Sequence, residues 1–307
     1  HINGEIRSGD FYKNPALLEA VEHAKKFDSA LHLMGCTSPG GIHSHIDHLI
    51  ALLELASRKG LKKIFLHFIA DGQDAPPQDA INVLHTLEPY LKKAGARIAS
   101  IQGRSYAMDR VLNWAVTEKV WHSAILGDGT ATTDPAEYLK AAYADDVTDY
   151  ALKPATVVEE GMPVGPVQDN DAFIFFDFRN DRVRQMASTL IYADSFKEFN
   201  PVRRPKNVKV VTMTKYAEEF TVPIAYPALD LPNTIGEVVS RAGWKQWRIA
   251  EKEKEAHVTN FFNGGRIKPF TGEQREIVSS RKMKGPEYIA HPEMSAQQVV
   301  DAVLQSA

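Results

Sequence analysis

Apolar runs of strand length alternate with amphipathic, helix-like stretches through the first half of this 307-residue chain. We predict strands at residues 30–36, 63–70, 97–102 and 123–127. Between them we predict helices at residues 44–58 and 79–94 and a short helix from about residue 109. Strand, turn and helix repeated in this order predict an α/β fold, a mainly parallel sheet with helices on both faces.

The second half continues this pattern and then departs from it. Residues 145–171 are rich in Pro, Gly and acidic side chains and predict extended or hairpin structure. The predicted elements that follow are strands at 172–179 and 207–214 and a helix at 181–190. Turn-forming residues at 229–234 precede a new series of elements, a helix at 235–242, strands at 246–250 and 257–262, and a helix at 293–304. We therefore expect two domains, residues 1–228 and 229–307.

The composition excludes several classes of protein. Hydrophobic residues make up 44 % of the chain, which suffices for a sizeable core. With 36 Lys and Arg against 39 Asp and Glu, no basic surface for nucleic acid is expected. No stretch approaches the roughly 18 apolar residues of a membrane helix, so we expect no membrane partner. The one cysteine, Cys36, allows no internal disulfide, fits a cytoplasmic location, and is expected to be a small buried side chain.

The loop after the first predicted strand carries two glycines and three histidines. Gly40 and Gly41 let the backbone approach an anion at the start of the next helix. His43 at this entrance is either a donor to a phosphate or carboxylate or a surface residue. His45 and His48 are three positions apart and form either a zinc pair or two solvated helix residues. We favour solvated residues because no third ligand stands at metal spacing.

Carboxylates follow the second predicted strand. Asp71 and Asp74 stand on either side of Gly72 and Gln73. Their carboxylates suit three roles: binding a metal, capping the next helix, or accepting a proton from a substrate hydroxyl.

Four arginines follow two other predicted strands. Arg104 and Arg110 come after the third strand, and Arg179 and Arg182 come after the strand at 172–179. Each guanidinium forks two hydrogen bonds to a carboxylate or phosphate and keeps its charge. Taken singly, such an arginine is usually half of a surface ion pair. Because ligands of open α/β sheets bind at the carboxyl ends of the strands, four arginines there suit a small dianion.

Seven stretches, in this order, resemble the cofactor-independent phosphoglycerate mutase family. They are GGIHSHIDHL, DGQDAPP, GRSYAMDR, FIFFDFRNDRVRQ, MTKY, RIAEKEKEAHVTNFFNGG and HPEMSA. They are spread across nearly the whole chain, so the set is highly specific. The resemblance implies a glycolytic isomerase of the alkaline phosphatase superfamily, which interconverts 3-phosphoglycerate and 2-phosphoglycerate through a phosphoserine. It also implies two Mn²⁺ or Mg²⁺ ions and no requirement for 2,3-bisphosphoglycerate.

The resemblance further implies an assignment of domains and residues. Residues 1–228 would be the inserted, substrate-binding transferase domain, and residues 229–307 part of the α/β phosphatase-type, metal-binding domain. The implied catalytic residues are Asp74, which handles the proton of the glycerate hydroxyl, and Lys254, beside the phosphoryl group. The implied substrate-binding residues are His43, Gln73, Asp74, Arg104, Arg110, Arg179, Arg182 and Lys254.

The chain also departs from the family pattern. Gln73 stands where the family reads Arg, which removes a cation, and Asp177 stands where it reads Asn, which adds a negative charge near Arg179. The family's segments with the serine nucleophile and the metal ligands match nothing here. We therefore expect residues 1–307 to be a central part of the enzyme, monomeric, without metal ligands and inactive by itself. The alternatives are a non-catalytic phosphoglycerate-binding module and another metal-dependent phosphatase or phosphomutase of the superfamily.

Overall fold

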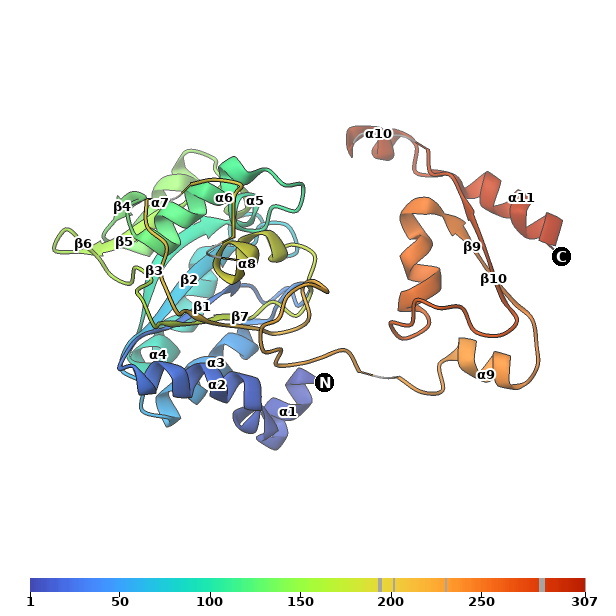
Figure 1. Cartoon of the computed structure of the whole chain (residues 1–307). Helices are drawn as coiled ribbons and strands as arrows, with labels where there is room; N and C mark the ends of the chain where they lie inside the picture. Colours follow the sequence, from blue (N-terminus) through green and yellow to red (C-terminus); the bar gives the residue numbers. More distant parts are fainter. Residues whose placement is uncertain (193–194, 201, 230, 282–284, 307) are drawn as a thin grey trace. The chain divides into compact units, whose positions relative to one another are not determined.

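A computed structural model of the chain describes residues 1–192, 195–200, 202–229, 231–281 and 285–306, and its elements are labelled in Figure 1. The chain divides into two compact units, residues 1–227 and 228–307. The strands of the first unit are β1 (Leu31–Cys36), β2 (Ile64–Ala70), β3 (Ala96–Gly103), β4 (Thr130–Thr132), β5 (Ala155–Glu159), β6 (Met162–Pro163), β7 (Ala172–Phe175) and β8 (Lys209–Thr212). Its α-helices are α1 (Ile2–Ser8), α2 (Pro15–Lys26), α3 (Ile46–Arg58), α4 (Ala80–Ala94), α5 (Arg104–Ala107), α6 (Trp114–Val120), α7 (Pro135–Ala144) and α8 (Arg184–Ile191). Shorter helical turns are η1 (Asp10–Lys13), η2 (Trp121–Leu126) and η3 (Asp149–Ala151).

The strands of the first unit form one sheet in the order β4-β5-β3-β2-β1-β7-β8, with β6 paired to β5. β3, β2, β1, β7 and β8 are parallel neighbours, whereas β5 runs antiparallel to β3. This confirms the predicted α/β class and the mainly parallel sheet. The carboxyl ends of four parallel strands, β1, β2, β3 and β7, lead into the loops that carry the predicted site residues.

Side chains of successive strand residues alternate between two hydrophobic clusters, one on each face of the sheet. In β7, Ile174 belongs to the cluster that also contains side chains of α2, α3, α4 and α7. Its neighbours Phe173 and Phe175 belong to the cluster formed with α5, α6 and α8. Burial on both faces explains why these strands are almost continuously apolar in the sequence.

A chain of four buried polar side chains crosses the sheet on the face of Phe173. His32 Nε2 lies 3.1 Å from Asp171 Oδ2, His32 Nδ1 lies 3.0 Å from His67 Nε2, and His67 Nδ1 lies 2.9 Å from Ser100 Oγ. Because a carboxylate only accepts, His32 Nε2 donates to Asp171. His67 Nε2 then donates to His32 Nδ1, and the Ser100 hydroxyl donates to His67 Nδ1. Burial, and then the nearby His32, lowers the pKa of His67 well below its usual value, so His67 is neutral in the folded protein.

This protonation state predicts that the protein loses stability in mild acid. Below pH about 6.5 the unfolded chain binds a proton at His67 that the folded chain does not, so the free energy of unfolding falls by up to about 1.4 kcal/mol per pH unit. Urea unfolding at pH 7.0, 6.0 and 5.0 should show this decline, and His67→Gln should make it shallower. The exposed His85, changed to Gln, is the control and should leave the slope unchanged. Equal slopes in the wild type and His67→Gln would contradict the prediction.

Two predicted strands are wrong. Residues 123–126 belong to η2, a π-helical turn that Gly127 ends, in which Trp121, Ala124 and Ile125 recur at helical spacing and enter the second cluster. Residues 257–261 are likewise a π-helical turn, η5 (His257–Phe261), and not a strand. There the Thr259 hydroxyl donates to the Glu255 carbonyl one turn back. Both stretches are short and rich in apolar or aromatic residues, and such a composition occurs in strands and in helices alike.

Three other predicted elements have different bounds in the structure. The helix expected from residue 109 begins at Trp114, because the Asp109 carboxylate accepts from Val111 N and Asn113 N and holds a turn. The strand expected at 172–179 ends at Phe175. The helix expected from residue 181 begins at Arg184, so a loop of irregular backbone separates this strand from its helix.

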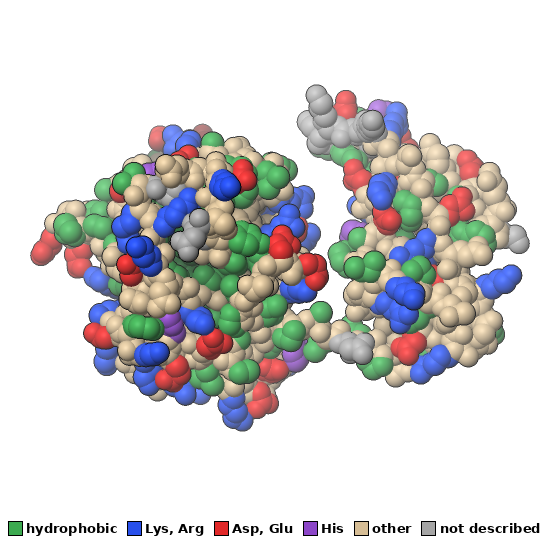
Figure 2. Space-filling model, viewed as in Figure 1, with side chains coloured by type: hydrophobic (Ala, Val, Ile, Leu, Met, Phe, Trp, Pro, Cys, Tyr) green, Lys and Arg blue, Asp and Glu red, His purple; other side chains and the backbone are tan. Residues whose placement is uncertain are grey.

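The second unit contains a two-stranded parallel sheet, β9 (Gln246–Glu251) and β10 (Glu273–Val278). Its helices and turns are α9 (Ile235–Arg241), η4 (Lys252–Lys254), η5 (His257–Phe261), α10 (Gly285–Ala290) and α11 (Ala296–Ser306). Hydrophobic side chains lie at its surface (Figure 2), among them Trp244, Phe261 and Leu304. Parallel sheets are normally covered on both faces, so this unit has apolar surface that a larger domain would bury. Within the described residues, no helix is both long and apolar enough to cross a membrane.

Candidate functional site

The loops that follow β1, β2, β3 and β7 meet at the carboxyl edge of the sheet. A Cβ atom at Gly40 would lie 2.6 Å from the Asp74 carbonyl oxygen, so only glycine allows the first two loops to approach this closely. The backbone N–H groups of Phe178 and Arg179 donate to the His43 carbonyl at 2.7 and 3.2 Å. These backbone contacts bring residues that are far apart in the sequence into one site.

Arg104 is the central cation of this site. Its side chain is 1 % exposed, and its Nη1 donates to Asp71 Oδ1 at 2.5 Å and to Asp74 Oδ2 at 2.7 Å. Its Nη2 donates to His43 Nε2 at 3.0 Å. A buried guanidinium is stable only with such partners, so Arg104 joins the loops after β1, β2 and β3. Burial opposes ionisation of Asp71, but hydrogen bonds from Asp74 N, Ser38 and Arg104 outweigh it and lower the pKa of Asp71.

His43 is held neutral and in one tautomer. Burial, followed by the positive charge of Arg104, lowers the pKa of His43 to about 4. Arg104 has only donors, so His43 Nε2 accepts and the ring proton is on Nδ1. His43 Nδ1 has no hydrogen-bond partner among the described residues, and the nearest carboxylate oxygen, Asp181 Oδ1, is 3.7 Å away. This buried N–H group therefore has no acceptor among the described residues.

Asp181 pairs with two further arginines of the predicted set. Its Oδ2 accepts from Arg110 Nη1 at 2.9 Å and from Arg179 Nη2 at 3.4 Å, and its Oδ1 is 3.1 Å from Arg179 Nε. The side chains of Arg110 and Arg179 are 50 % and 49 % exposed, so both guanidinium groups remain accessible to solvent.

Arg182 differs from the other three arginines. It is partly buried, and no hydrogen bond or ion pair joins it to any residue in the described part of the chain. Burial, then the positive charges of Arg110 and Arg104, lowers the pKa of Arg182 below its usual value. The guanidinium keeps its charge all the same. An unpaired, partly buried cation beside two others is the strongest mark of an anion-binding site here.

The two departures from the family pattern lie in different surroundings. The Gln73 side chain is exposed and forms no hydrogen bond with the described residues, while its backbone N–H donates to Asp71 Oδ1 at 3.2 Å. Asp177 is fully buried and accepts from Cys36 N at 3.2 Å. Burial raises the pKa of Asp177 well above its usual value. Burial therefore disfavours the negative charge that we predicted near Arg179.

Of the other candidates of these loops, Cys36 and His48 are buried and His45 is partly exposed. Cys36 is a free, buried thiol, as predicted, and burial raises its pKa. The prediction that His48 is a solvated residue is wrong, because it is buried and its Nε2 is 2.6 Å from Asn3 Oδ1. His45 caps the helix instead, since its ring nitrogen accepts from Asp47 N.

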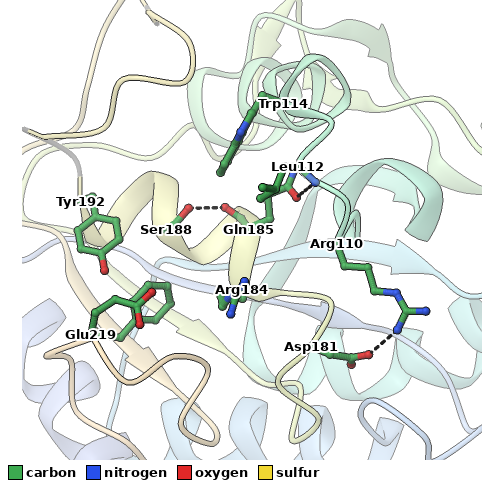
Figure 3. Close-up of a pocket in the computed structure, with 10 residues that line it drawn as sticks. Arg110, Leu112, Trp114, Asp181, Arg184, Gln185, Ser188, Tyr192 and Glu219 are labelled. Carbon is green, nitrogen blue, oxygen red and sulfur yellow. Dashed lines mark hydrogen bonds and ion pairs between the residues drawn. The ribbon is translucent and has the colours of Figure 1, made fainter. Parts of the chain in front are cut away.

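A pocket of about 160 Å³ adjoins the Arg110–Asp181 pair. Figure 3 shows Asp181 and Arg110 facing one another, with Gln185 and Ser188 of α8 along the pocket. Its lining residues are Arg110, Leu112, Trp114, Asp181, Arg184, Gln185, Ser188, Tyr192, Glu219 and Phe220.

The structure brings His43, Asp74, Arg104, Arg110 and Arg179 together through the contacts above. Lys254 belongs to the second unit, where it ends turn η4 with an exposed side chain. Nowhere in residues 1–192, 195–200, 202–229, 231–281 and 285–306 do three His, Cys, Asp or Glu side chains form a metal-binding group. The described residues thus do not fit the two metal ions that the resemblance implies, and we derive no step through a metal from them.

The site residues that the resemblance implies do not include Asp71 or Asp181, although Asp71 is one of the two carboxylates that follow the second predicted strand. Both form ion pairs with predicted arginines. A signal for Asp71 was present, because a buried arginine at a strand end requires a carboxylate and Asp71 directly follows β2. Asp181 stands between Arg179 and Arg182 in the sequence.

Comparisons with known proteins point to one family. Residues 2–218 match the family model described as "BPG-independent PGAM N-terminus". The chain is 42 % identical over 308 residues to the 2,3-bisphosphoglycerate-independent phosphoglycerate mutase of Moorella thermoacetica, covering 99 % of this chain and 59 % of that protein. It is 46 % identical over 307 residues to 2,3-bisphosphoglycerate-independent phosphoglycerate mutase 2 of Methanosarcina acetivorans, covering 99 % and 58 %.

A solved structure is also similar. It is a crystal structure of Leishmania mexicana phosphoglycerate mutase at low cobalt concentration, with a TM-score of 0.76 and 29 % identity. The match covers 99 % of this chain and 57 % of the Leishmania chain. The chain thus spans less than two thirds of the length of the relatives that it matches.

Proposed function

Since the chain belongs to the family of 2,3-bisphosphoglycerate-independent phosphoglycerate mutases, we propose that it provides the substrate-binding part of an enzyme that interconverts 3-phosphoglycerate and 2-phosphoglycerate. In this proposal residues 1–227 bind the substrate, and residues 228–307 belong to the phosphatase-type, metal-binding domain. The apolar surface of the second unit supports its place in a larger domain.

One observation supports phosphoglycerate as the ligand more than any other. Arg182 is partly buried and without a partner among the described residues, and Arg110 and Arg179 keep accessible guanidinium groups. Three cations with free donors suit a ligand that carries both a phosphate and a carboxylate. Arg104 has a different role, because Asp71 and Asp74 already neutralise it and it fixes the loops.

Asp74 and His43 are suited to the glycerate hydroxyl groups. Asp74 Oδ2 is bound by Arg104, while Oδ1 is bonded to none of the residues that the structure describes. We assign to Oδ1 the proton of the attacking hydroxyl, since a positioned carboxylate acts as a general base. The neutral His43 donates its Nδ1 proton to a substrate oxygen. Lys254 is assigned to the phosphoryl group.

The phosphoryl transfer itself requires groups that we do not assign to the described residues. We propose that a serine nucleophile and the ligands of two Mn²⁺ or Mg²⁺ ions are supplied from outside residues 1–307, and that no 2,3-bisphosphoglycerate is consumed. The metals would stabilise the charge of the transferred group. We further propose that the protein acts as a monomer in the cytoplasm, with a small-molecule substrate as its partner.

A coupled assay tests the division of labour. The 307-residue chain, supplied with 3-phosphoglycerate, Mn²⁺ and excess enolase, should produce no phosphoenolpyruvate, because the nucleophile is assigned elsewhere. A relative of full family length, assayed in parallel, shows that the coupling system works. Turnover by the 307-residue chain would refute the assignment of the nucleophile and metal ligands.

The Gln73 position gives a prediction of gained affinity. Gln73→Arg adds a cation beside Asp74 in an exposed position, where an added ion pair contributes about 1 kcal/mol or less. We therefore expect the dissociation constant for 3-phosphoglycerate to fall about three- to fivefold at low salt, and less at high salt. Titration calorimetry at two salt concentrations measures this. Gln78→Arg, which adds the same charge to an exposed position on the same loop, is the control, and an equal gain there would contradict a local effect.

A further inference from the structure

Asp181 links three residues of the predicted site that come from three different loops. Its carboxylate is shared by Arg110, from the loop after β3 and α5, and by Arg179, from the loop after β7. On the same side lies the ring of His43, whose Nδ1 is 3.7 Å from Asp181 Oδ1. Figure 3 shows the Asp181 carboxylate directed at the guanidinium of Arg110.

The contacts with Asp181 leave most donors of the two arginines free. A guanidinium has five N–H groups. Only Nη1 of Arg110, and Nε and Nη2 of Arg179, contact Asp181, and no other partner of either side chain exists among the described residues. Both side chains are about half exposed. The pair can therefore keep Asp181 and bind a further anion at the same time.

Two neighbouring guanidinium groups repel one another, and each is on a long, flexible side chain. Without a carboxylate between them, both would turn into solvent, and an incoming anion would have to order them again. Arg182 adds a third positive charge nearby and has no partner in the described part of the chain. Because cations are in excess here, the Asp181 carboxylate between Arg110 and Arg179 is needed to hold their guanidinium groups near one another.

We propose that Asp181 is a positioning residue that holds Arg110 and Arg179 side by side, so that their free donors bind one anionic group of the substrate. The proposal rests on phosphoglycerate binding as proposed above. The opposite role, an internal anion that competes with the substrate, would require Asp181 to occupy the donors that the substrate needs. The free donors of both arginines argue against that role.

Titration calorimetry with 3-phosphoglycerate on the 307-residue chain tests the proposal. Asp181→Asn keeps the shape and removes the charge, and we expect binding at least about tenfold weaker with an unchanged melting temperature. In the background of Arg110→Ala or Arg179→Ala, the same change should have a smaller effect than in the wild type, because one of the two residues that it positions is gone. Asp28→Asn is the matched control. Asp28 is 98 % exposed, pairs with Lys63 and precedes β1 at the opposite edge of the sheet, so its loss should not change affinity.

Each outcome decides one question. No binding by the wild-type chain would refute the proposed function itself. Wild-type binding together with equal or tighter binding by Asp181→Asn would refute the positioning role and indicate a competing anion. Additive losses in the double variants would refute it as well. If Asp181→Asn does not fold, Asp181→Glu should bind several-fold more weakly than wild type, since its carboxylate is displaced by one methylene, and unchanged affinity there would overturn the proposal.

Discussion

Arg104→Ala is expected to lower the free energy of unfolding by about 3–5 kcal/mol, the effect of removing one partner from a buried ion pair. The substitution leaves Asp71, which is 5 % exposed, without its cation. Asp74 also loses the hydrogen bond from Arg104 Nη1, and His43 Nε2 loses the one from Arg104 Nη2. The variant should also fail to bind 3-phosphoglycerate, because three loops of the site lose their common contact. Urea unfolding at pH 7, followed by circular dichroism, measures the first effect.

The dependence of the free energy of unfolding on pH also distinguishes Arg104→Ala from the wild type. In the wild type the pKa of Asp71 is lowered, so its ionisation contributes stability above the unfolded pKa of about 4, and this contribution is lost as the pH falls. Arg104→Ala has lost that contribution already, so the difference between the two proteins should shrink below pH 4. Arg97→Ala, on the neighbouring strand β3, removes an exposed pair with Glu159 at 2.8 Å and should cost about 1 kcal/mol or less. Equal losses in the two variants would contradict the central role of Arg104.

Arg182→Ala is expected to weaken 3-phosphoglycerate binding by about 10- to 100-fold, since a hydrogen bond to a charged group contributes about 1.5–3 kcal/mol. The melting temperature should not fall, because Arg182 is bonded to no described residue and its removal leaves no carboxylate unpaired. It should even rise slightly, as a positive charge near Arg110 and Arg104 is removed.

Arg7→Ala is the matched control for this variant. Arg7 belongs to α1 and is exposed, and it has no hydrogen bond or ion pair with the described residues. It should change affinity by less than about threefold, the size of a long-range charge effect in salt. Calorimetry on both variants at one ionic strength makes the comparison. A similar loss of affinity in both would indicate general attraction of anions instead of a site at Arg182.

The sequence predicted the sheet well because burial on both faces leaves a strong pattern. β1 and β2 are almost continuously apolar, and the helices that follow them show helical periodicity. The two false strands lie in segments where this pattern is ambiguous. In η2, Trp121 and Ile125 are buried by packing against the sheet, and a short apolar run does not reveal the backbone that achieves this.

The candidate site was predicted in part. Strand-end loops identified His43, Asp74 and Arg104 as candidates, and the structure brings them into direct contact. The sequence did not show that these three side chains bind one another. Nor did it show that Arg104 is buried whereas Arg110 and Arg179 are about half exposed. Such a distinction depends on which side chains are covered, and burial of a polar residue has no periodic signal. The partners of Arg110 and Arg179 were missed for the same reason, because Asp181 looks like any loop acid.

Titration calorimetry of the 307-residue chain with 3-phosphoglycerate directly tests the claim that residues 1–227 bind phosphoglycerate at the carboxyl edge of the sheet. We expect saturable binding at one site with a dissociation constant between about 1 μM and 1 mM, the usual range for metabolic substrates. Inorganic phosphate at the same concentration should bind much more weakly, because it lacks the carboxylate. No saturable heat with 3-phosphoglycerate from a folded chain, or equal affinity for inorganic phosphate, would contradict the claim.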